Sequence, residues 1–123
     1  MRTAAGRAPL EGGWVLEGAD AAGRPLRLVF GQSELAAAYL GLVIGRHPAL
    51  SDRVIGGDEA LSRRHCRLGI ANGGLFIEDL HSLNGTFVDG EPRAAFHPLP
   101  LKSGQTVQIG QAALQVRRLT ADD

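Results

Sequence analysis

Three short polar segments contain the residues of this sequence that are best suited to hold an anion. They are Gly45 with Arg46, residues 62–65 (Ser-Arg-Arg-His) and residues 82–86 (Ser-Leu-Asn-Gly-Thr). Arginine presents a planar fork of N–H donors that matches phosphate oxygens, and a serine hydroxyl adds another donor. An asparagine can both donate and accept, so Asn84 could hold a peptide backbone. Many donors without an activated nucleophile favour recognition of an anion over catalysis.

Short β-strands are the elements that would have to position these segments. Apolar and polar residues alternate over residues 26–30, and Asn72-Gly73 and Asp89-Gly90 are turn signals typical of hairpins. Further strands are expected at 14–16, 42–44, 53–55, 65–70, 75–77, 86–88, 107–109 and 114–116. Only residues 33–39 favour a helix, of one or two turns, which would be too short to be stable alone. We therefore expect an all-β sandwich or barrel. In a sandwich, the loops at one end would converge and build a site there.

The composition is that of a single globular domain. The chain has 123 residues, a formal net charge of zero and one cysteine, Cys66. A neutral chain argues against non-specific nucleic-acid binding, and a single cysteine favours a reducing compartment. No apolar run is long enough for a signal peptide or a membrane span, so we expect a cytoplasmic protein without a membrane or nucleic-acid partner. We expect one domain over residues 10–119, with flexible tails at 1–9 and 120–123.

The three polar segments, together with residues 101–110, resemble the forkhead-associated (FHA) domain family. The family pattern is Gly-Arg, then Ser-x-x-His, then Ser-x-Asn-Gly-Thr, and later Leu-x-x-Gly-x-x-Val-x-Ile-Gly. All four parts occur here in order, and the resemblance covers roughly residues 40–118. It implies an FHA-type β-sandwich of about eleven strands with one or two short helical turns. It also implies a module that binds phosphothreonine peptides in signalling, catalyses no reaction and needs no cofactor.

The resemblance gives individual residues a role. Five would bind the phosphopeptide: Arg46 and Ser62 at the phosphate, Arg63 as a second basic contact, Leu83 through its backbone, and Asn84 at the peptide main chain. Four would support the site: Gly45, His65, Gly85 and Thr86. Four more are candidates to flank the peptide: His47, Ala60, Arg64 and His81. The partner would be a threonine-phosphorylated protein or peptide, with a Ser/Thr kinase or its substrate as a candidate.

Two chemical alternatives find little support in the sequence. Ser62, His65 and an acid such as Asp58 or Asp79 are the residue types of a catalytic triad, but no Gly-x-Ser-x-Gly elbow is present. The four histidines and Cys66 match no zinc-ligand spacing, so no metal site is predicted. Cys66 is expected to be a small buried apolar residue.

Three further expectations concern the use of the fold. An FHA-fold scaffold could serve phosphate-independent interaction or dimerisation, which an unchanged affinity after dephosphorylation of the partner would reveal. Phosphorylation of Thr3 or Thr120 would let a tail fold back into the site or reach a second copy. The large aromatic side chains are expected in the core rather than at a ligand: Trp14, Phe30, Phe76 and Phe87.

Overall fold

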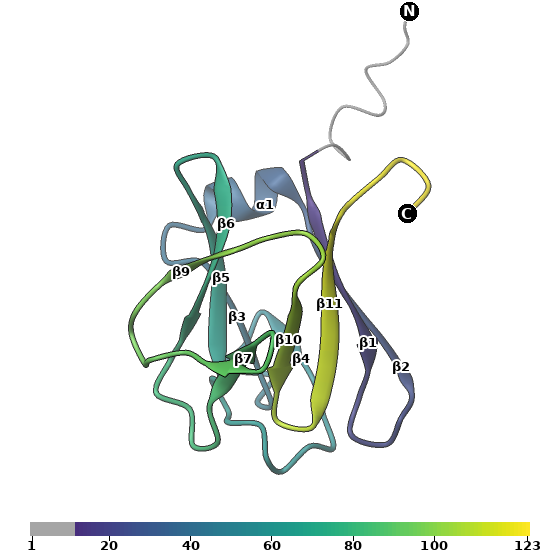
Figure 1. Cartoon of the computed structure of the whole chain (residues 1–123), viewed down its shortest axis with the longest axis vertical. Helices are drawn as coiled ribbons and strands as arrows, with labels where there is room; N and C mark the ends of the chain where they lie inside the picture. Colours follow the sequence, from purple (N-terminus) through teal and green to yellow (C-terminus); the bar gives the residue numbers. More distant parts are fainter. Residues whose placement is uncertain (1–11) are drawn as a thin grey trace, which may run out of the picture.

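Two β-sheets packed face to face, with one short helix at one end, make up the protein (Figure 1). The computed structural model describes residues 12–123. The strands of the first sheet lie in the order β2-β1-β11-β10-β7-β8, and those of the second in the order β4-β3-β5-β6-β9. The elements are β1 (Trp14–Ala19), β2 (Pro25–Phe30), α1 (Gln32–Ala37), β3 (Leu42–Gly45), β4 (Arg53–Val54), β5 (Cys66–Ala71), β6 (Gly74–Asp79), β7 (Thr86–Val88), β8 (Glu91–Pro92), β9 (Leu99–Leu101), β10 (Thr106–Ile109) and β11 (Ala112–Arg118). The predicted all-β sandwich of about eleven strands is confirmed.

The core lies between the two sheets and is filled by alternate residues of their strands. In β10 and β11, Val107, Ile109, Leu114 and Val116 are fully buried, whereas the residues between them face outward. A fully buried aliphatic side chain contributes about 1.5–3 kcal/mol, so this alternation fixes the register of each strand. Cys66 is buried in the same cluster, as expected, and burial raises the pKa of its thiol.

Two of the four aromatic side chains expected in the core, Phe76 and Phe87, are only half-buried, whereas Trp14 and Phe30 are buried. Phe76 pairs with Gly69 across β5 and β6. Successive side chains of a strand point to opposite faces, and the neighbours of Phe76 on both sides are core residues. The Phe76 ring therefore lies on the outer face. It covers Gly69 so closely that a Cβ there would come within 2.4 Å of the ring.

The helix α1 ends two residues earlier than the sequence indicated. Its only buried residue is Leu35, and the half-buried C-cap residue Ala38 packs against the core where the chain leaves the helix. The chain then turns through Tyr39 and Leu40, whose side chains are 97% and 72% exposed, and enters β3. No helix within residues 12–123 has the length and apolar character needed to cross a bilayer.

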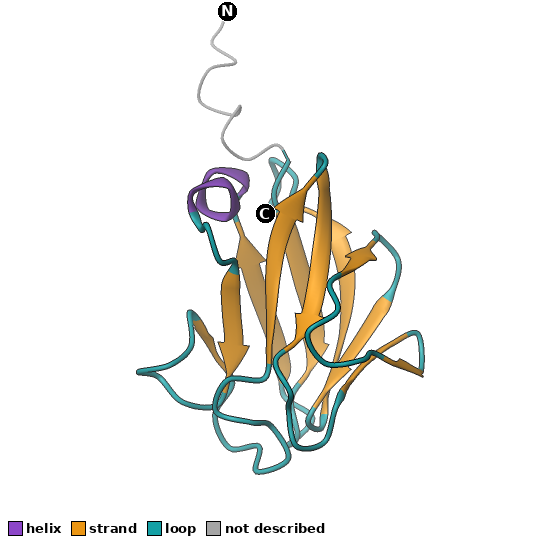
Figure 2. Cartoon of the chain, turned by 90° about the vertical axis from the view of Figure 1, so that its left-hand side faces the viewer, coloured by secondary structure: helices purple, strands orange, loops and turns teal. Residues whose placement is uncertain are grey.

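The connecting loops gather at the end of the sandwich opposite α1. Figure 2 shows the long loops at the lower end, below the strands, and the helix at the upper end. The connections β3–β4, β4–β5 and β6–β7 contain the three polar segments. At the α1 end, the chain terminus turns back, and the Asp123 carboxylate accepts hydrogen bonds from Arg27 and Arg117. Flexibility of residues 120–123 and the domain limits 10–119 stay predictions, and the tail over 1–9, with Thr3, lies outside the described residues.

Candidate functional site

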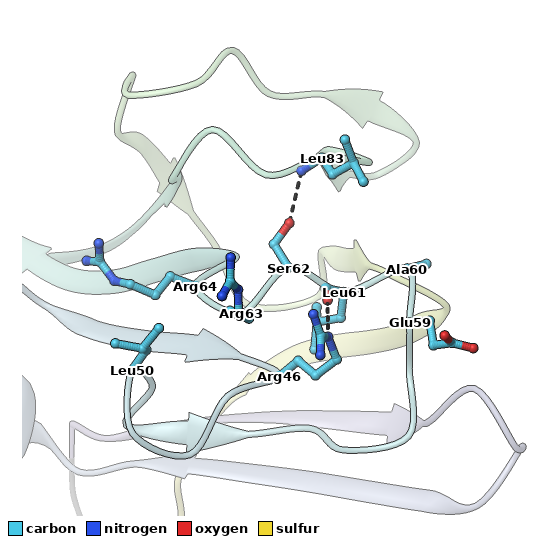
Figure 3. Close-up of a pocket in the computed structure, with 9 residues that line it drawn as sticks. All are labelled: Arg46, Leu50, Glu59, Ala60, Leu61, Ser62, Arg63, Arg64 and Leu83. Carbon is cyan, nitrogen blue, oxygen red and sulfur yellow. Dashed lines mark hydrogen bonds between the residues drawn. The ribbon is translucent and has the colours of Figure 1, made fainter.

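A pocket of about 520 Å³ lies where the three polar segments meet (Figure 3). It is lined by Arg46, Leu50, Glu59, Ala60, Leu61, Ser62, Arg63, Arg64 and Leu83. Four of the five residues predicted to bind the phosphopeptide are in this set, and so are two of the four predicted to flank it. Sequence reasoning missed the apolar side chain of Leu50 and the acidic side chain of Glu59. The tertiary structure thus brings together residues that are far apart in the chain.

Arg46 is held at the end of β3 by two contacts with the segment before β5. Its N–H donates to the Ser62 carbonyl at 3.0 Å, and its side-chain Nε donates to the Leu61 carbonyl at 3.0 Å. Within residues 12–123, its two terminal nitrogens donate to no protein acceptor, so they are available to an anion. The close approach requires glycine at position 45, because a Cβ there would lie 2.0 Å from the Arg63 carbonyl oxygen.

The Ser62 hydroxyl is oriented by the neighbouring loop. Its Oγ accepts a hydrogen bond of 2.9 Å from the Leu83 N–H (Figure 3). Because the oxygen accepts there, the hydroxyl proton remains available to donate to a ligand. The Leu83 N–H is already used in this bond, so a ligand contact from Leu83 would come from its carbonyl or from its side chain, which is 87% exposed.

Asn84 joins two of the loops rather than lining the pocket. Its Nδ2 donates to the Ala60 carbonyl at 2.9 Å, which leaves Oδ1 free to accept from a peptide N–H. The amide therefore presents an acceptor beside the pocket, which is the group that a peptide main chain would need. The predicted role of Asn84 stays a prediction that this geometry permits.

The buried side chain of His65 connects the second and third polar segments. Its Nδ1 accepts from the Ser62 N–H at 3.0 Å, and its Nε2 lies 2.8 Å from the Gly85 carbonyl oxygen. This pattern assigns a neutral ring with the proton on Nε2. The ring is fully buried, and burial lowers the pKa of His65, although the Gly85 carbonyl and the carboxylates of Asp79 and Asp58 act in the opposite direction.

Asp79 fixes the segment 82–86. Its buried carboxylate accepts from the Ser82 N–H at 3.1 Å, from the Ser82 hydroxyl at 2.5 Å and from the Thr86 hydroxyl at 2.7 Å. The Ser82 oxygen in turn accepts from the Gly85 N–H at 3.0 Å. Gly85 has a φ of +90°, a conformation that favours glycine. These bonds hold the tight turn that carries Leu83 and Asn84.

Asp58 is a second buried carboxylate that holds a site loop. It accepts from the Ala60 N–H at 3.1 Å and from the Gln111 N–H at 2.7 Å, and so connects the pocket wall to the β10–β11 turn. Sequence reasoning considered Asp58 and Asp79 only as the acid of a hypothetical catalytic triad. The spacing of Asp79, three positions before Ser82, is typical of a carboxylate that accepts from nearby backbone N–H groups and could have indicated this role.

The pocket concentrates positive charge that has no acidic partner. Within residues 12–123, Arg46, Arg63 and Arg64 form no ion pair, whereas five other arginines pair with Asp or Glu. In Figure 3, Arg64 extends away from Arg46, so the cations are spread along the pocket. Glu59 is the only acidic residue among those that line it. The arrangement is suited to a multiply charged anion.

Neither catalytic nor metal chemistry fits the geometry. Ser62 Oγ is bonded to Leu83, and His65 contacts the Ser62 backbone rather than its hydroxyl, so no base activates a nucleophile. Asp58 and Asp79 are bonded to loop groups and not to the His65 ring. Among the residues that the structure describes, no three His, Cys, Asp or Glu side chains are grouped as a metal ion would require.

A β-sandwich with hydrogen-bonded loops at one end, whose arginines have no acidic partner within residues 12–123, has the features of an anion-recognition domain. The chain belongs to the FHA domain family, which it matches over residues 42–110. It is therefore a phosphothreonine-binding module and not an enzyme.

Comparison with individual proteins agrees with this family. Over 70 residues the chain is 41% identical to the oxoglutarate dehydrogenase inhibitor of Corynebacterium glutamicum, covering 57% of this chain and 46% of that protein. It is 37% identical over 70 residues to the glycogen accumulation regulator GarA of Mycobacterium tuberculosis, covering 57% and 40%. The chain thus spans less than half the length of these relatives.

Solved FHA structures share the fold. The FHA domain of the CT664 protein from Chlamydia trachomatis aligns with a TM-score of 0.67 at 25% identity, covering 85% of this chain and 95% of that one. The FhaA FHA domain in complex with the intracellular domain of Rv3910 aligns with a TM-score of 0.61 at 26% identity, covering 85% and 99%.

Proposed function

We propose that the pocket binds the phosphate of a phosphothreonine in a partner protein, with Arg46 and Ser62 as its principal contacts. The observation that carries this proposal is which hydrogen-bond donors in the pocket have no protein acceptor. The Ser62 hydroxyl accepts from Leu83 and the Arg46 Nε donates to Leu61, so the Ser62 proton and the two Arg46 terminal nitrogens remain for a ligand in one pocket. Arg63, also without an acidic partner in the described chain, supplies a second positive charge.

Charge and donor count support a phosphate over a carboxylate. A phosphothreonine carries about −1.5 to −2 charges and three acceptor oxygens. Each charge-assisted hydrogen bond contributes about 1.5–3 kcal/mol, so loss of the Arg46 fork would remove most of a micromolar affinity. Asn84 would hold the peptide main chain beside the phosphate, and the Leu83 carbonyl or side chain would add a further contact.

The partner in this proposal is a threonine-phosphorylated protein, either a Ser/Thr kinase or one of its substrates, in the cytoplasm. Two considerations support it. Two of the similar proteins are named an oxoglutarate dehydrogenase inhibitor and a glycogen accumulation regulator, which are names of regulatory proteins. The similar FHA domain of FhaA forms a complex with the intracellular domain of another protein.

Titration with three degenerate peptide libraries tests the proposal. The libraries carry phosphothreonine, phosphoserine or unmodified threonine at one fixed position. We expect binding to the phosphothreonine library, weaker binding to phosphoserine by at least about fourfold because one methyl group is lost, and none to threonine. Arg46→Ala should weaken binding by at least about 100-fold. Arg24→Ala, which removes the same charge outside the pocket, should leave it unchanged.

Two results would contradict the proposal. Equal binding of phosphorylated and unmodified libraries would assign the fold to phosphate-independent interaction. Wild-type affinity in a folded Arg46→Ala variant, with an unchanged circular dichroism spectrum, would place the phosphate elsewhere.

A further inference from the structure

Both asparagines of the sequence, Asn72 and Asn84, are followed by a glycine. An Asn-Gly pair can react with itself, because glycine has no side chain to shield its backbone nitrogen from the preceding asparagine amide. Asparagine is accordingly among the thermolabile residues of proteins. Asn72 lies in the β5–β6 turn at the α1 end of the sandwich, and Asn84 lies in the β6–β7 loop at the other end (Figure 1). The same dipeptide therefore occurs in two different surroundings.

The first pair is open to solvent. Asn72 and Gly73 are both exposed and form the two-residue turn between Ala71 and Gly74, with φ values of +54° and +78°. In the part of the chain that the structure describes, neither the Asn72 amide nor the Gly73 N–H has a hydrogen-bond partner. A Cβ at position 73 would meet no atom within 4 Å. The Gly73 nitrogen and the side-chain carbonyl carbon of Asn72 are thus free to approach each other.

The second pair has the same chemistry, but each of its reacting groups is held by a different partner. The Gly85 N–H donates to Ser82 Oγ at 3.0 Å, and Asn84 Nδ2 donates to the Ala60 carbonyl at 2.9 Å. Gly85 is also covered by Phe87, whose ring would lie 3.3 Å from a Cβ at position 85. Ring closure at Asn84 therefore has to break two hydrogen bonds that the first pair does not have.

We propose that Asn72 is a site of spontaneous covalent modification, and that the hydrogen bonds of the β6–β7 loop protect Asn84 from the same reaction. The Gly73 nitrogen attacks the side-chain carbonyl carbon of Asn72. A C–N bond forms, and the side-chain nitrogen leaves as ammonia with the proton of the Gly73 N–H, which gives a cyclic imide. Water then adds to either imide carbonyl and opens the ring to aspartate or isoaspartate. The net reaction consumes water and releases ammonia, so it requires no oxidant or cofactor.

The two products differ in their effect on the turn. Aspartate keeps the path of the main chain, whereas isoaspartate leads it through the former side chain and adds a methylene group to the backbone. The turn joins two directly paired residues, Ala71 and Gly74, and a two-residue turn has no room for an additional backbone atom. Isoaspartate should therefore loosen the β5–β6 hairpin and lower Tm, while the pocket at the other end is unchanged.

Peptide mapping by mass spectrometry, on the full chain incubated in mildly alkaline buffer, tests the proposal. In the native protein we expect Asn72 to convert at least about tenfold faster than Asn84, because two hydrogen bonds restrain the second pair. In urea that unfolds the chain, both should convert at similar rates, since both precede glycine. Ser82→Ala, which frees the Gly85 N–H, should accelerate Asn84 alone. Ser103→Ala, in the exposed β9–β10 turn, is the matched control and should change neither rate.

The comparison of native and unfolded wild type needs no variant, so it decides the proposal even where Ser82→Ala does not fold. Equal native rates, or no conversion of Asn72, would overturn the modification site. An unchanged Asn84 rate in a folded Ser82→Ala variant would overturn the assignment of the protection to that hydrogen bond. Protein converted at Asn72 should bind phosphothreonine peptides as tightly as fresh protein. A loss of affinity in proportion to the conversion would contradict the independence of the pocket from the β5–β6 turn.

Discussion

Two polar regions of the molecule are built on opposite principles. On the outer face of β1, β2 and β11, the partly exposed side chains of Glu17, Arg27 and Arg117 pair with one another and with the largely covered Asp123 carboxylate. In the loops at the other end, buried His65, Asp58 and Asp79 bond mainly to backbone N–H groups, carbonyls and hydroxyls, while the arginines have no acidic partner in the described chain. The first region neutralises its own charges, whereas the second leaves its charges available to a ligand.

This difference shows which kind of interaction fixes the geometry of the phosphate site. Ion pairs between exposed side chains are screened by water and contribute little to stability, so the network at the outer face does not have to be rigid. A buried acceptor or donor that loses its partner is penalised strongly, so each bond of the loop network has to be made. The phosphate site is therefore positioned by hydrogen bonds from buried side chains to neutral backbone and hydroxyl groups.

The largest effect should follow from removal of the Asp79 carboxylate. Asp79→Ala leaves the Ser82 N–H, the part-buried Ser82 hydroxyl and the buried Thr86 hydroxyl without an acceptor, which should lower the free energy of unfolding by about 2–4 kcal/mol. Urea denaturation measures this loss. Asp79→Asn retains one carbonyl acceptor and should lose less. An Asp79→Ala variant as stable as the wild type would show that the loop does not depend on this residue.

A smaller effect, confined to binding, is expected from comparing two loop serines whose hydroxyls are used differently. Ser51 Oγ donates to the Arg63 carbonyl at 2.8 Å, whereas the Ser62 proton is left for the ligand. Ser62→Ala should weaken phosphothreonine-peptide affinity by about 10- to 100-fold, and Ser51→Ala by much less. Isothermal titration calorimetry would measure both. Equal losses would mean that neither hydroxyl donates directly to the phosphate.

Acid should weaken the loop region through His65. Burial lowers the pKa of His65 in the folded protein, so below about pH 6.5 the unfolded chain binds a proton that the folded chain resists. Stability is therefore complete above pH 6.5 and falls as the pH decreases toward the folded value. We expect the free energy of unfolding to be lower at pH 5.5 than at pH 7.5.

His65→Gln tests the assignment, because its amide cannot titrate in this range. The variant should show a flatter dependence of unfolding free energy on pH over that interval. If the wild type and His65→Gln lost stability in parallel, another group would be responsible.

The smallest effect is expected at the outer face. Asp123 and Glu17 raise the pKa of Arg117, but the side chains of Arg117 and Glu17 are 35% and 40% exposed, so water and salt screen their attraction. Arg117→Ala should leave peptide affinity unchanged and lower Tm only slightly, with the difference disappearing in high salt. A loss of stability as large as that of Asp79→Ala would remove the contrast between the two regions.

Much of the fold could be predicted because its signals are local. Alternation over β10 and β11 and the Asn-Gly and Asp-Gly turns predicted strands that the structure contains. The error at Phe76 came from treating an aromatic residue as core although its neighbours Leu75 and Ile77 already occupied the inner face. The one short helix was predicted as well, although its end was placed two residues late because intrinsic propensity does not fix where a helix ends.

The candidate site could be predicted in its residue types but not in its bonding. Four motif parts in order indicated the family and named Arg46 and Ser62. They did not show that the Leu83 N–H is committed to Ser62, or that Asp58 and Asp79 hold the loops rather than activate a base. Nor did they show that Phe96 lies against His81.

The sequence by itself thus determined the family, the strand pattern and the residues able to meet a phosphate, because turn chemistry, alternation and motif spacing are properties of short segments. Only the tertiary structure decided which donors are used internally and which stay free. Those bonds join positions that are 21 residues apart for Leu83 and Ser62 and 53 apart for Gln111 and Asp58. Such contacts exist only once two sheets have packed and their loops meet, so no local pattern encodes them.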